Sequence, residues 1–311
     1  PSRAMIMTGQ AYHRIPMSLA GVDTLPQRLG EAGYTTFISG KWHNDPPALV
    51  RSFQQGKAIM LGGMSNHVEV PLVDILPERK LGNQRYGDGF STEMFADEAI
   101  RFLSEYDGDA PFYCYVPFTA PHDPRQPPQE YRDKYYARNV PPPPTFMPQH
   151  PFDNGALLTR DENLAAWPRT EEVIRDQLAE YYGLVEHLDA QIGRILGALE
   201  KTKYADNTYI VFAADHGLGM GSHGLLGKQS VYEHSMRAPM IVVGPGVPHG
   251  ETHALTYLLD TVPTIAEWAG MEALAPVDGT SLAALWRGER DSLRDVIFLS
   301  YEESQRALVE S

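Results

Sequence analysis

Three apolar runs along the chain are each followed directly by polar or charged residues. They are residues 34–39 (YTTFIS), 111–118 (PFYCYVPF) and 207–214 (NTYIVFAA). All three are rich in β-branched and aromatic residues and almost uninterrupted in apolar character. This composition is typical of strands that are buried on both faces of a parallel sheet. The pattern therefore predicts three buried strands, each with a polar segment at its carboxyl end.

Helical patterns lie between these runs. Apolar residues recur every three to four positions in 91–106 and, most regularly, in 171–201. Residues 24–33 and 260–270 are predicted as shorter helices, with Thr24 as the N-cap of the first. Helices that alternate with buried strands predict an α/β fold, with a mostly parallel central sheet and helices on both faces.

Residues 139–167 differ from the rest of the chain because they are rich in proline and lack periodicity. Proline removes a backbone donor, so this stretch is not expected to form a helix or a central strand. We interpret it as a long surface loop, hereafter the excursion. Long loops in compact domains often carry function. The sequence leaves open whether this loop lines a substrate cleft or only packs on the surface.

The polar segments carry the candidate chemistry. Ligands in open α/β sheets bind beyond the carboxyl ends of the strands, so His43, His122 and Asp215 are expected to converge although they are distant in sequence. Asp215 and His216 could bind a divalent cation through oxygen and nitrogen donors. On its own, an Asp at a strand end is a structural cap or turn residue about as often as it is a ligand.

Positive residues accompany these groups. Lys41 precedes His43 in GKWH, and Lys228 follows a glycine-rich segment that begins at Asp215. A lysine supplies a point charge for a tetrahedral oxyanion, whereas His122, on a proline-flanked turn, could hydrogen-bond or move a proton. Arg3 begins a predicted short helix, whose N-terminus would also attract anions.

Composition excludes some functions. The 311 residues include 26 Lys and Arg against 40 Asp and Glu, a net charge of −14, which argues against nucleic acid as a partner. No stretch approaches the roughly 20 apolar residues of a membrane span. The single Cys114 excludes an intramolecular disulfide.

Several motifs occur in the order found in one enzyme family. PSRAMIMTG opens the chain, GYTTFISGKWH and APHDP follow, and DHGLGMGSHGLLGK ends at Lys228. Three later segments, MRAPMIVVGPG, DTVPTIAEWAG and DGTSLAALWRG, extend the match over nearly the whole chain. The sequence resembles the type I, formylglycine-dependent sulfatases of the alkaline phosphatase superfamily.

The resemblance implies a mechanism and roles for individual residues. A formylglycine hydrate would attack the sulfur of a sulfate monoester and expel the alcohol. Arg3 and His43 would hold this nucleophile, Lys41 and Lys228 would bind sulfate oxygens, and His122 would contact the sulfate or protonate the leaving oxygen. Asp215 and His216 would be two of the ligands of one Ca²⁺. The substrate would be a small-molecule or polysaccharide sulfate ester, with a soluble carbohydrate favoured by the acidic surface.

The resemblance also implies that part of the family's site lies outside this sequence. The nucleophile, a Cys or Ser that becomes formylglycine, would lie two residues before Pro1. We therefore expect a fragment truncated at both ends and inactive alone, in which 1–290 form a partial catalytic domain and 291–311 begin a C-terminal subdomain. A periplasmic or secreted location is expected from the family.

Two alternatives stay open from the sequence. A phosphonate monoester or phosphodiester hydrolase of the same superfamily would use nearly the same residues. A non-catalytic, anion-binding pseudoenzyme would differ at the residue two before Pro1, where an enzyme requires Cys or Ser. The sequence specifies neither the oligomeric state nor the sulfated substrate.

Overall fold

A five-stranded sheet forms the centre of the computed structural model, which describes residues 1–272 and 275–310. Its strands lie in the order β4-β3-β2-β1-β5, and β1 runs parallel to both β2 and β5. The pairings of β3 with β2 and with β4 are antiparallel. The predicted α/β class is confirmed, with the difference that the sheet is mixed rather than mostly parallel. The strands are β1 (Thr35–Trp42), β2 (Gln55–Leu61), β3 (Pro71–Ile75), β4 (Leu81–Tyr86) and β5 (Phe112–Tyr115).

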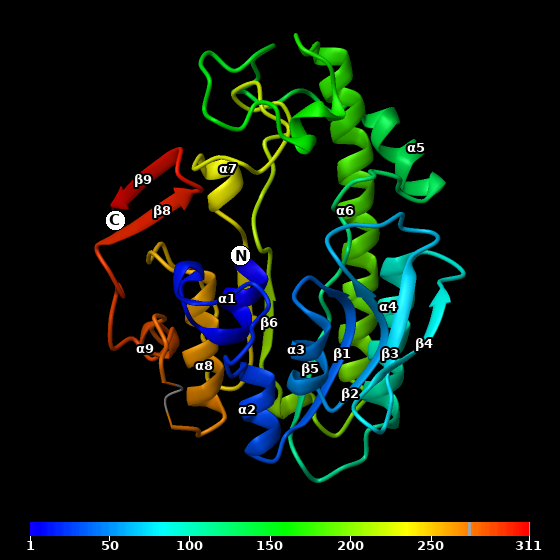
Figure 1. The fold of residues 1–311 in the computed structure, drawn as a ribbon, viewed down its shortest axis with the longest axis vertical. Helices are drawn as coiled ribbons and strands as arrows, with labels where there is room; N and C mark the ends of the chain where they lie inside the picture. Colours follow the sequence, from blue (N-terminus) through cyan, green and yellow to red (C-terminus); the bar gives the residue numbers. More distant parts are fainter. Residues whose placement is uncertain (273–274, 311) are drawn as a thin grey trace.

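Helices cover both faces of this sheet because β1 buries alternate side chains on opposite sides. Phe37 packs with Phe102 and Leu103 of α4 (Ser91–Glu105). Its neighbour Ile38 packs on the other face, in the cluster that includes residues of α1 (Ser2–Thr8) and α3 (Pro46–Ser52). Figure 1 shows α4 and α6 on one side of the strands and α1, α2 and α3 on the other.

The predicted helices form close to their expected bounds. Residues 24–33 contain α2 (Leu25–Glu31), and the Thr24 hydroxyl accepts the N–H of Gln27 as an N-cap should. Residues 171–201 contain α6 (Glu171–Leu199), which packs along α4, and residues 260–270 contain α8 (Thr261–Trp268). The sequence pattern did not predict the short α3, α5 (Gln129–Arg138), α7 (Glu233–Met236) or α9 (Ala283–Trp286).

Two further pairs of strands lie outside the central sheet. β6 (Ile210–Ala213), the third predicted strand, pairs antiparallel with β7 (Met240–Val243). Within the described residues β6 does not join the sheet of β1 and β5, so only two of the three predicted strands are neighbours. A hairpin of β8 (Val296–Tyr301) and β9 (Gln305–Glu310) ends the described chain. The boundary between a catalytic domain ending at residue 290 and a C-terminal subdomain starting at residue 291 stays a prediction.

The excursion runs from the end of α5 to the start of α6 without a helix or strand of regular length. It contains only the 3-10 turn Arg160–Leu164 and one isolated bridge, between Phe146 and Ser222. Figure 1 shows it, in green, beside the yellow segment before α7 at the top of the molecule. The N–H of His223 donates to the Thr145 carbonyl at 2.7 Å, which confirms the contact.

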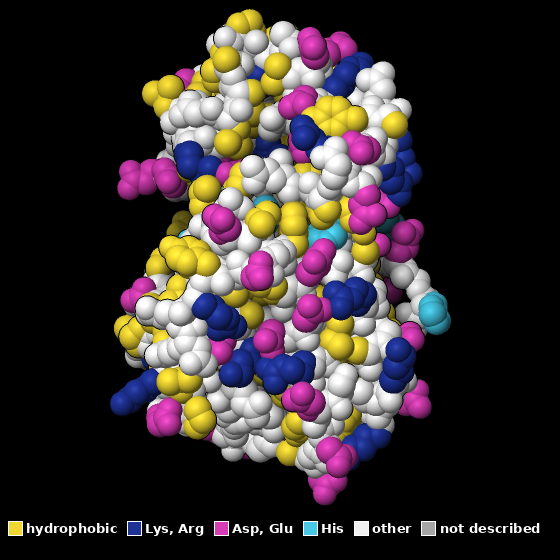
Figure 2. Space-filling model, turned by 90° about the vertical axis from the view of Figure 1, so that its right-hand side faces the viewer, with side chains coloured by type: hydrophobic (Ala, Val, Ile, Leu, Met, Phe, Trp, Pro, Cys, Tyr) yellow, Lys and Arg dark blue, Asp and Glu magenta, His cyan; other side chains and the backbone are white. Residues whose placement is uncertain are grey.

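The surface carries charges of both signs. Figure 2, which views the side of β4 and α5, shows acidic and basic groups interspersed rather than gathered in separate fields. Among the described helices, none combines the length and the apolar composition that crossing a bilayer requires.

Candidate active site

A distortion near the end of β1 determines where Lys41 lies. The register with β2 shifts between Ile38 and Gly40, and Gly40 has a φ of 126°. A Cβ at Gly40 would lie 2.2 Å from the Pro117 carbonyl oxygen, which accepts the N–H of Lys41 at 2.6 Å. Only glycine fits this close approach. As a result, Lys41 is directed into the protein and is only 6% exposed.

The burial of Lys41 changes its acidity. Desolvation is the largest cause and the nearby positive charge of Arg3 the next, and together they lower the pKa of Lys41 to about 8. The amine remains mostly protonated at neutral pH. A buried ammonium of this kind binds an anion more strongly than an exposed one, because its charge is poorly screened by water.

Arg3 links the ends of three strands. Its Nη1 donates to the Lys41 carbonyl at 3.3 Å and its Nη2 to the Phe118 carbonyl at 3.4 Å. Its Nε lies 3.3 Å from Oδ2 of Asp215, which follows β6. The structure thus brings the end of β1, the segment after β5 and the end of β6 into one place, as their strand-end positions predicted. It adds the first residues of the chain, which that prediction did not include.

Asp215 and His216 converge at the end of β6. Oδ1 of Asp215 lies 3.5 Å from Nε2 of His216. Burial opposes ionisation of Asp215, but the charges of Arg3 and then His216 outweigh it and hold the pKa of Asp215 below its ordinary value. Gly217 follows, and a Cβ there would meet the His234 carbonyl oxygen at 2.0 Å, so the turn requires glycine.

The two donors fit part of a divalent-cation site. Asp215 and His216 lie on adjacent positions with their donor atoms close together. The described residues contain no group of three or more His, Cys, Asp or Glu side chains arranged to hold a metal ion. Since Ca²⁺ takes six to eight oxygen ligands, Asp215 would supply only a share of its coordination, beside the nitrogen donor of His216.

His122 and Lys228 form a direct pair. Nζ of Lys228 lies 3.4 Å from Nε2 of His122. Because an ammonium only donates, Nε2 accepts and the ring proton lies on Nδ1, which donates to the Asp123 carbonyl at 3.0 Å. Burial lowers the pKa of His122. The ring is therefore neutral at pH 7, with its lone pair facing the lysine.

His43 lies at the exposed rim of the same region. A Cβ on Gly63 would come within 2.9 Å of its Nε2. Partial burial, followed by the positive charges of Lys41 and Arg3, lowers the pKa of His43. The structure thus places the seven predicted site residues around the ends of β1, β5 and β6, while their individual roles stay predictions.

Four further side chains lie around this site and were not predicted from the sequence to belong to it. Asp123 contacts the His122 ring, and Arg160 and Asp161 reach the site from the excursion. His67 is buried and its Nε2 hydrogen-bonds to the His122 carbonyl oxygen at 2.9 Å. Asp123 could have been found from its place in APHDP, but Arg160 and Asp161 lie where the sequence has no pattern.

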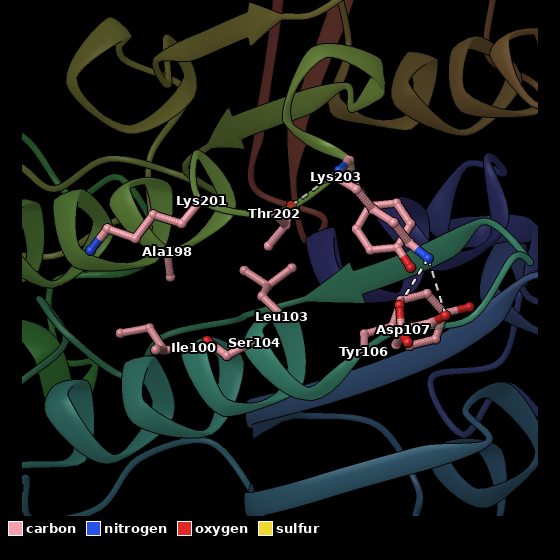
Figure 3. A pocket seen from close by; sticks show the side chains of 10 residues that line it. Ile100, Leu103, Ser104, Tyr106, Asp107, Ala198, Lys201, Thr202 and Lys203 are labelled. Atoms are coloured by element: carbon pink, nitrogen blue, oxygen red, sulfur yellow. Dashed lines mark hydrogen bonds and ion pairs between the residues drawn. The ribbon is translucent and has the colours of Figure 1, made fainter.

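A hollow of about 670 Å³ lies elsewhere, between the C-terminal ends of α4 and α6. Figure 3 shows Leu103, Tyr106 and Thr202 on its walls and Lys203 paired with Asp107. The seven predicted site residues are not among those that line it. This hollow is therefore separate from the candidate site.

The fold and the site together define an α/β protein with a cluster of cations at its strand ends, an arrangement that suits a tetrahedral oxyanion. The family model of the sulfatases matches residues 1–271. The chain therefore belongs to the sulfatase family, as the sequence motifs indicated.

Individual relatives agree with this assignment. The chain is 31% identical to an arylsulfatase of Clostridium perfringens, over 95% of this chain and 70% of the relative. It is 28% identical to a choline-sulfatase of Rhizobium meliloti, over 93% of this chain and 62% of the relative. The chain thus spans less than two thirds of the choline-sulfatase.

A solved structure shares the fold over the whole chain. It is that of a protein in complex with its substrate D-glucosamine-2-N,6-O-disulfate, with a TM-score of 0.82 and 22% identity. The match covers 100% of this chain and 77% of that structure. At this identity the similarity establishes the alkaline phosphatase-like fold.

Proposed function

We propose that the protein hydrolyses a sulfate monoester. The observation that carries the proposal is the convergence of Arg3, Lys41 and Lys228 with His122 at the strand ends, in a protein of the sulfatase family. Fixed cations in a partly buried site stabilise the negative charge that develops on sulfate oxygens as the ester bond breaks. Named sulfatases among the relatives support the same activity.

The surroundings of each residue support the proposed roles. Lys41, buried below the site, and Lys228, paired with His122, would bind sulfate oxygens. His122 presents a lone pair at Nε2 in the free protein, so the proton between this pair belongs to Lys228. Lys228 would then deliver this proton to the leaving oxygen once the substrate is bound, either directly or by first transferring it to Nε2 of His122.

Two groups would complete the site. A formylglycine two residues before Pro1 would supply the nucleophile, and Arg3 and His43 would orient it. Asp215 and His216 would hold a divalent cation, which we propose to be Ca²⁺ and which would add positive charge beside the sulfate. Calorimetric titration of the protein with CaCl₂ tests the cation, with binding expected in the parent and lost in Asp215→Asn. The control Asp278→Asn, whose carboxylate pairs with Arg14 outside the site, should bind as the parent does.

We further propose a soluble carbohydrate sulfate as substrate and a periplasmic or secreted location. The similar structure that holds a disulfated glucosamine supports the carbohydrate. A panel of sulfated sugars and hydrophobic sulfates, assayed with the protein that includes its upstream residues, tests the substrate class. Turnover of hydrophobic sulfates alone would contradict a carbohydrate. Fractionation of the native cells tests the location.

The alternative activity, hydrolysis of a phosphonate monoester or phosphodiester, is tested with the same protein. Rates on an aryl sulfate and on an aryl phosphodiester or phosphonate monoester are compared under one set of conditions. A higher kcat/KM for the sulfate supports our proposal, and the reverse order supports the alternative. Absence of turnover with all three, together with tight binding of inorganic sulfate, would indicate a pseudoenzyme.

A further inference from the structure

Five side chains form a closed ring of polar contacts at the edge of the site. Nδ1 of His122 lies 3.2 Å from the Asp123 carboxylate, whose two oxygens accept from Arg160 at 2.5 and 2.9 Å. Arg160 also donates to Asp161 at 2.7 Å. Asp161 lies 3.0 Å from Nζ of Lys228, and Lys228 closes the ring at His122 Nε2.

The ring joins residues of the family's motifs to residues of the excursion. His122, Asp123 and Lys228 belong to motif segments, whereas Arg160 and Asp161 belong to the excursion, which has no periodicity or motif. We propose that Arg160 and Asp161 are positioning residues, which hold the Lys228 ammonium against His122 Nε2 and so fix the His122 proton on Nδ1. The inference rests on the proposed function only for the identity of the anion that this pair receives.

The physical need for such positioning comes from the lysine. Its flexible four-carbon stem can place the ammonium in many positions. Without a partner for the ammonium, these positions differ little in free energy. Asp161 is 5% exposed, so its attraction for Lys228 acts with little screening. Burial opposes ionisation of Asp161, but the hydrogen bond from Gln229 and the charge of Lys228 hold the pKa of Asp161 below its ordinary value. The carboxylate is therefore charged at neutral pH.

Arg160 makes the arrangement electrically balanced. Asp123 and Asp161 would repel each other if left alone, and the guanidinium donates to both. With Lys228, the ring carries two positive and two negative charges around a neutral imidazole. An ammonium has three N–H groups. With two directed at Asp161 and His122, the third is available for a sulfate oxygen.

The excursion is also hydrogen-bonded to the glycine-rich segment. These bonds fix the relative position of the two segments that contribute to the ring. The Glu162 carboxylate accepts the backbone N–H groups of Leu226 at 3.0 Å and Gly227 at 2.8 Å. It also pairs at 2.7 Å with Arg169, which is fully buried. Asp161 thus lies on the same 3-10 turn as Glu162, which binds the residues immediately before Lys228.

The tautomer of His122 gives a direct test that does not depend on activity. Nitrogen-15 NMR of histidine-labelled protein, in sulfate-free buffer near pH 7.5, distinguishes a protonated from an unprotonated ring nitrogen. Assignment comes from the loss of one signal pair in His122→Gln. We expect the proton on Nδ1 in the parent protein, a shift of population toward Nε2 in Asp161→Asn, and the parent pattern restored in Asp161→Glu.

The control is Asp153→Asn, in the same excursion. Asp153 is exposed and accepts the N–H of Gly155 at 2.8 Å, away from the ring. It should leave the His122 signals unchanged. If Asp161→Asn does not fold, Arg160→Gln removes the bridge at a side chain that is 47% exposed. A parent tautomer on Nε2, or the same tautomer in the parent and in folded Asp161→Asn or Arg160→Gln, would overturn the proposal.

The second measurement is the affinity for inorganic sulfate, by calorimetry on the same variants. We expect a loss of about tenfold to 100-fold in Asp161→Asn, with most of it recovered in Asp161→Glu and none in Asp153→Asn. Equal affinity in Asp161→Asn and the parent would overturn the role at the anion site. If the tautomer shifts as expected but the parent binds no sulfate, the ring is supported and the proposed function fails, so the two outcomes are distinguishable.

Discussion

The Arg3 guanidinium lies 3.3 Å from the Asp215 carboxylate, although Arg3 belongs to the first of the family's motifs and Asp215 to the fourth. Arg3 belongs to the first turn of α1, and Asp215 follows β6. The same guanidinium donates to the carbonyl groups of Lys41 and Phe118. One side chain therefore fixes the relative positions of the carboxylate, the buried lysine and the segment leading to His122.

Replacing this side chain should disable the site. In Arg3→Met the Asp215 carboxylate loses its partner and the two carbonyl groups lose their donor, so kcat/KM for an aryl sulfate should fall on the order of 100-fold or more. Steady-state kinetics of the protein with its upstream residues measures the effect. Arg14→Met, which breaks an ion pair with Asp278 outside the site, should retain the parent rate. Equal losses in both variants would assign Arg3 a structural role only.

Gly40 offers a test of how Lys41 is aimed. In Gly40→Ala the new methyl would meet the Pro117 carbonyl oxygen, so the end of β1 must move and sulfate affinity should fall along with stability. Gly62→Ala is the matched control, because Gly62 has a φ of 109° and no atom within 4 Å of the position of a Cβ. The control should lose about 1–3 kcal/mol of stability and keep its affinity. Calorimetry and thermal unfolding separate the two effects.

The acidity of Lys41 predicts a pH dependence. Its pKa of about 8 means that the ammonium loses its proton as the pH rises through that value. Affinity for inorganic sulfate should therefore be constant below about pH 7 and weaken above pH 8. Lys41→Arg keeps its charge in this range and should lack the alkaline decline. An unchanged decline in that variant would assign it to another group.

The buried pair of Arg169 and Glu162 should dominate the stability of the excursion. Their side chains are 0% and 3% exposed. Arg169→Met leaves a buried carboxylate without its partner and should cost about 3–5 kcal/mol in the free energy of unfolding. The double variant with Glu162→Gln should recover part of this loss. Urea unfolding measures both, and a loss below 1 kcal/mol for the single variant would contradict the account.

Sequence patterns predicted some of the elements whose apolar residues recur at helical spacing or form an unbroken run. The helices at 91–106 and 171–201 appear nearly as expected, and 34–39 and 111–118 lie in neighbouring parallel strands. β2 and β3 were missed although most of their residues are buried, and β4 was missed because four of its six residues are exposed. β6 pairs with β7 instead of the central sheet.

The candidate site shows the same division. Its motif residues were identified because strand ends place them together, and family motifs add their spacing. Asp161 was not identified, since its contact with Lys228 depends on the path of a loop that has no period. The bulge at Gly40 was also missed, because its cause is the carbonyl of Pro117 on a distant segment.

The most direct test of the central claim is the comparison of kcat/KM for an aryl sulfate between the protein with its upstream residues and its Lys41→Met and Lys228→Met variants. Exposed Lys201, replaced by Met, serves as the control. We predict sulfate turnover by the parent and the control, and a loss on the order of 100-fold in each site variant. Turnover that is insensitive to both site lysines, or a parent that cleaves phosphodiesters but no sulfate ester, would contradict the account.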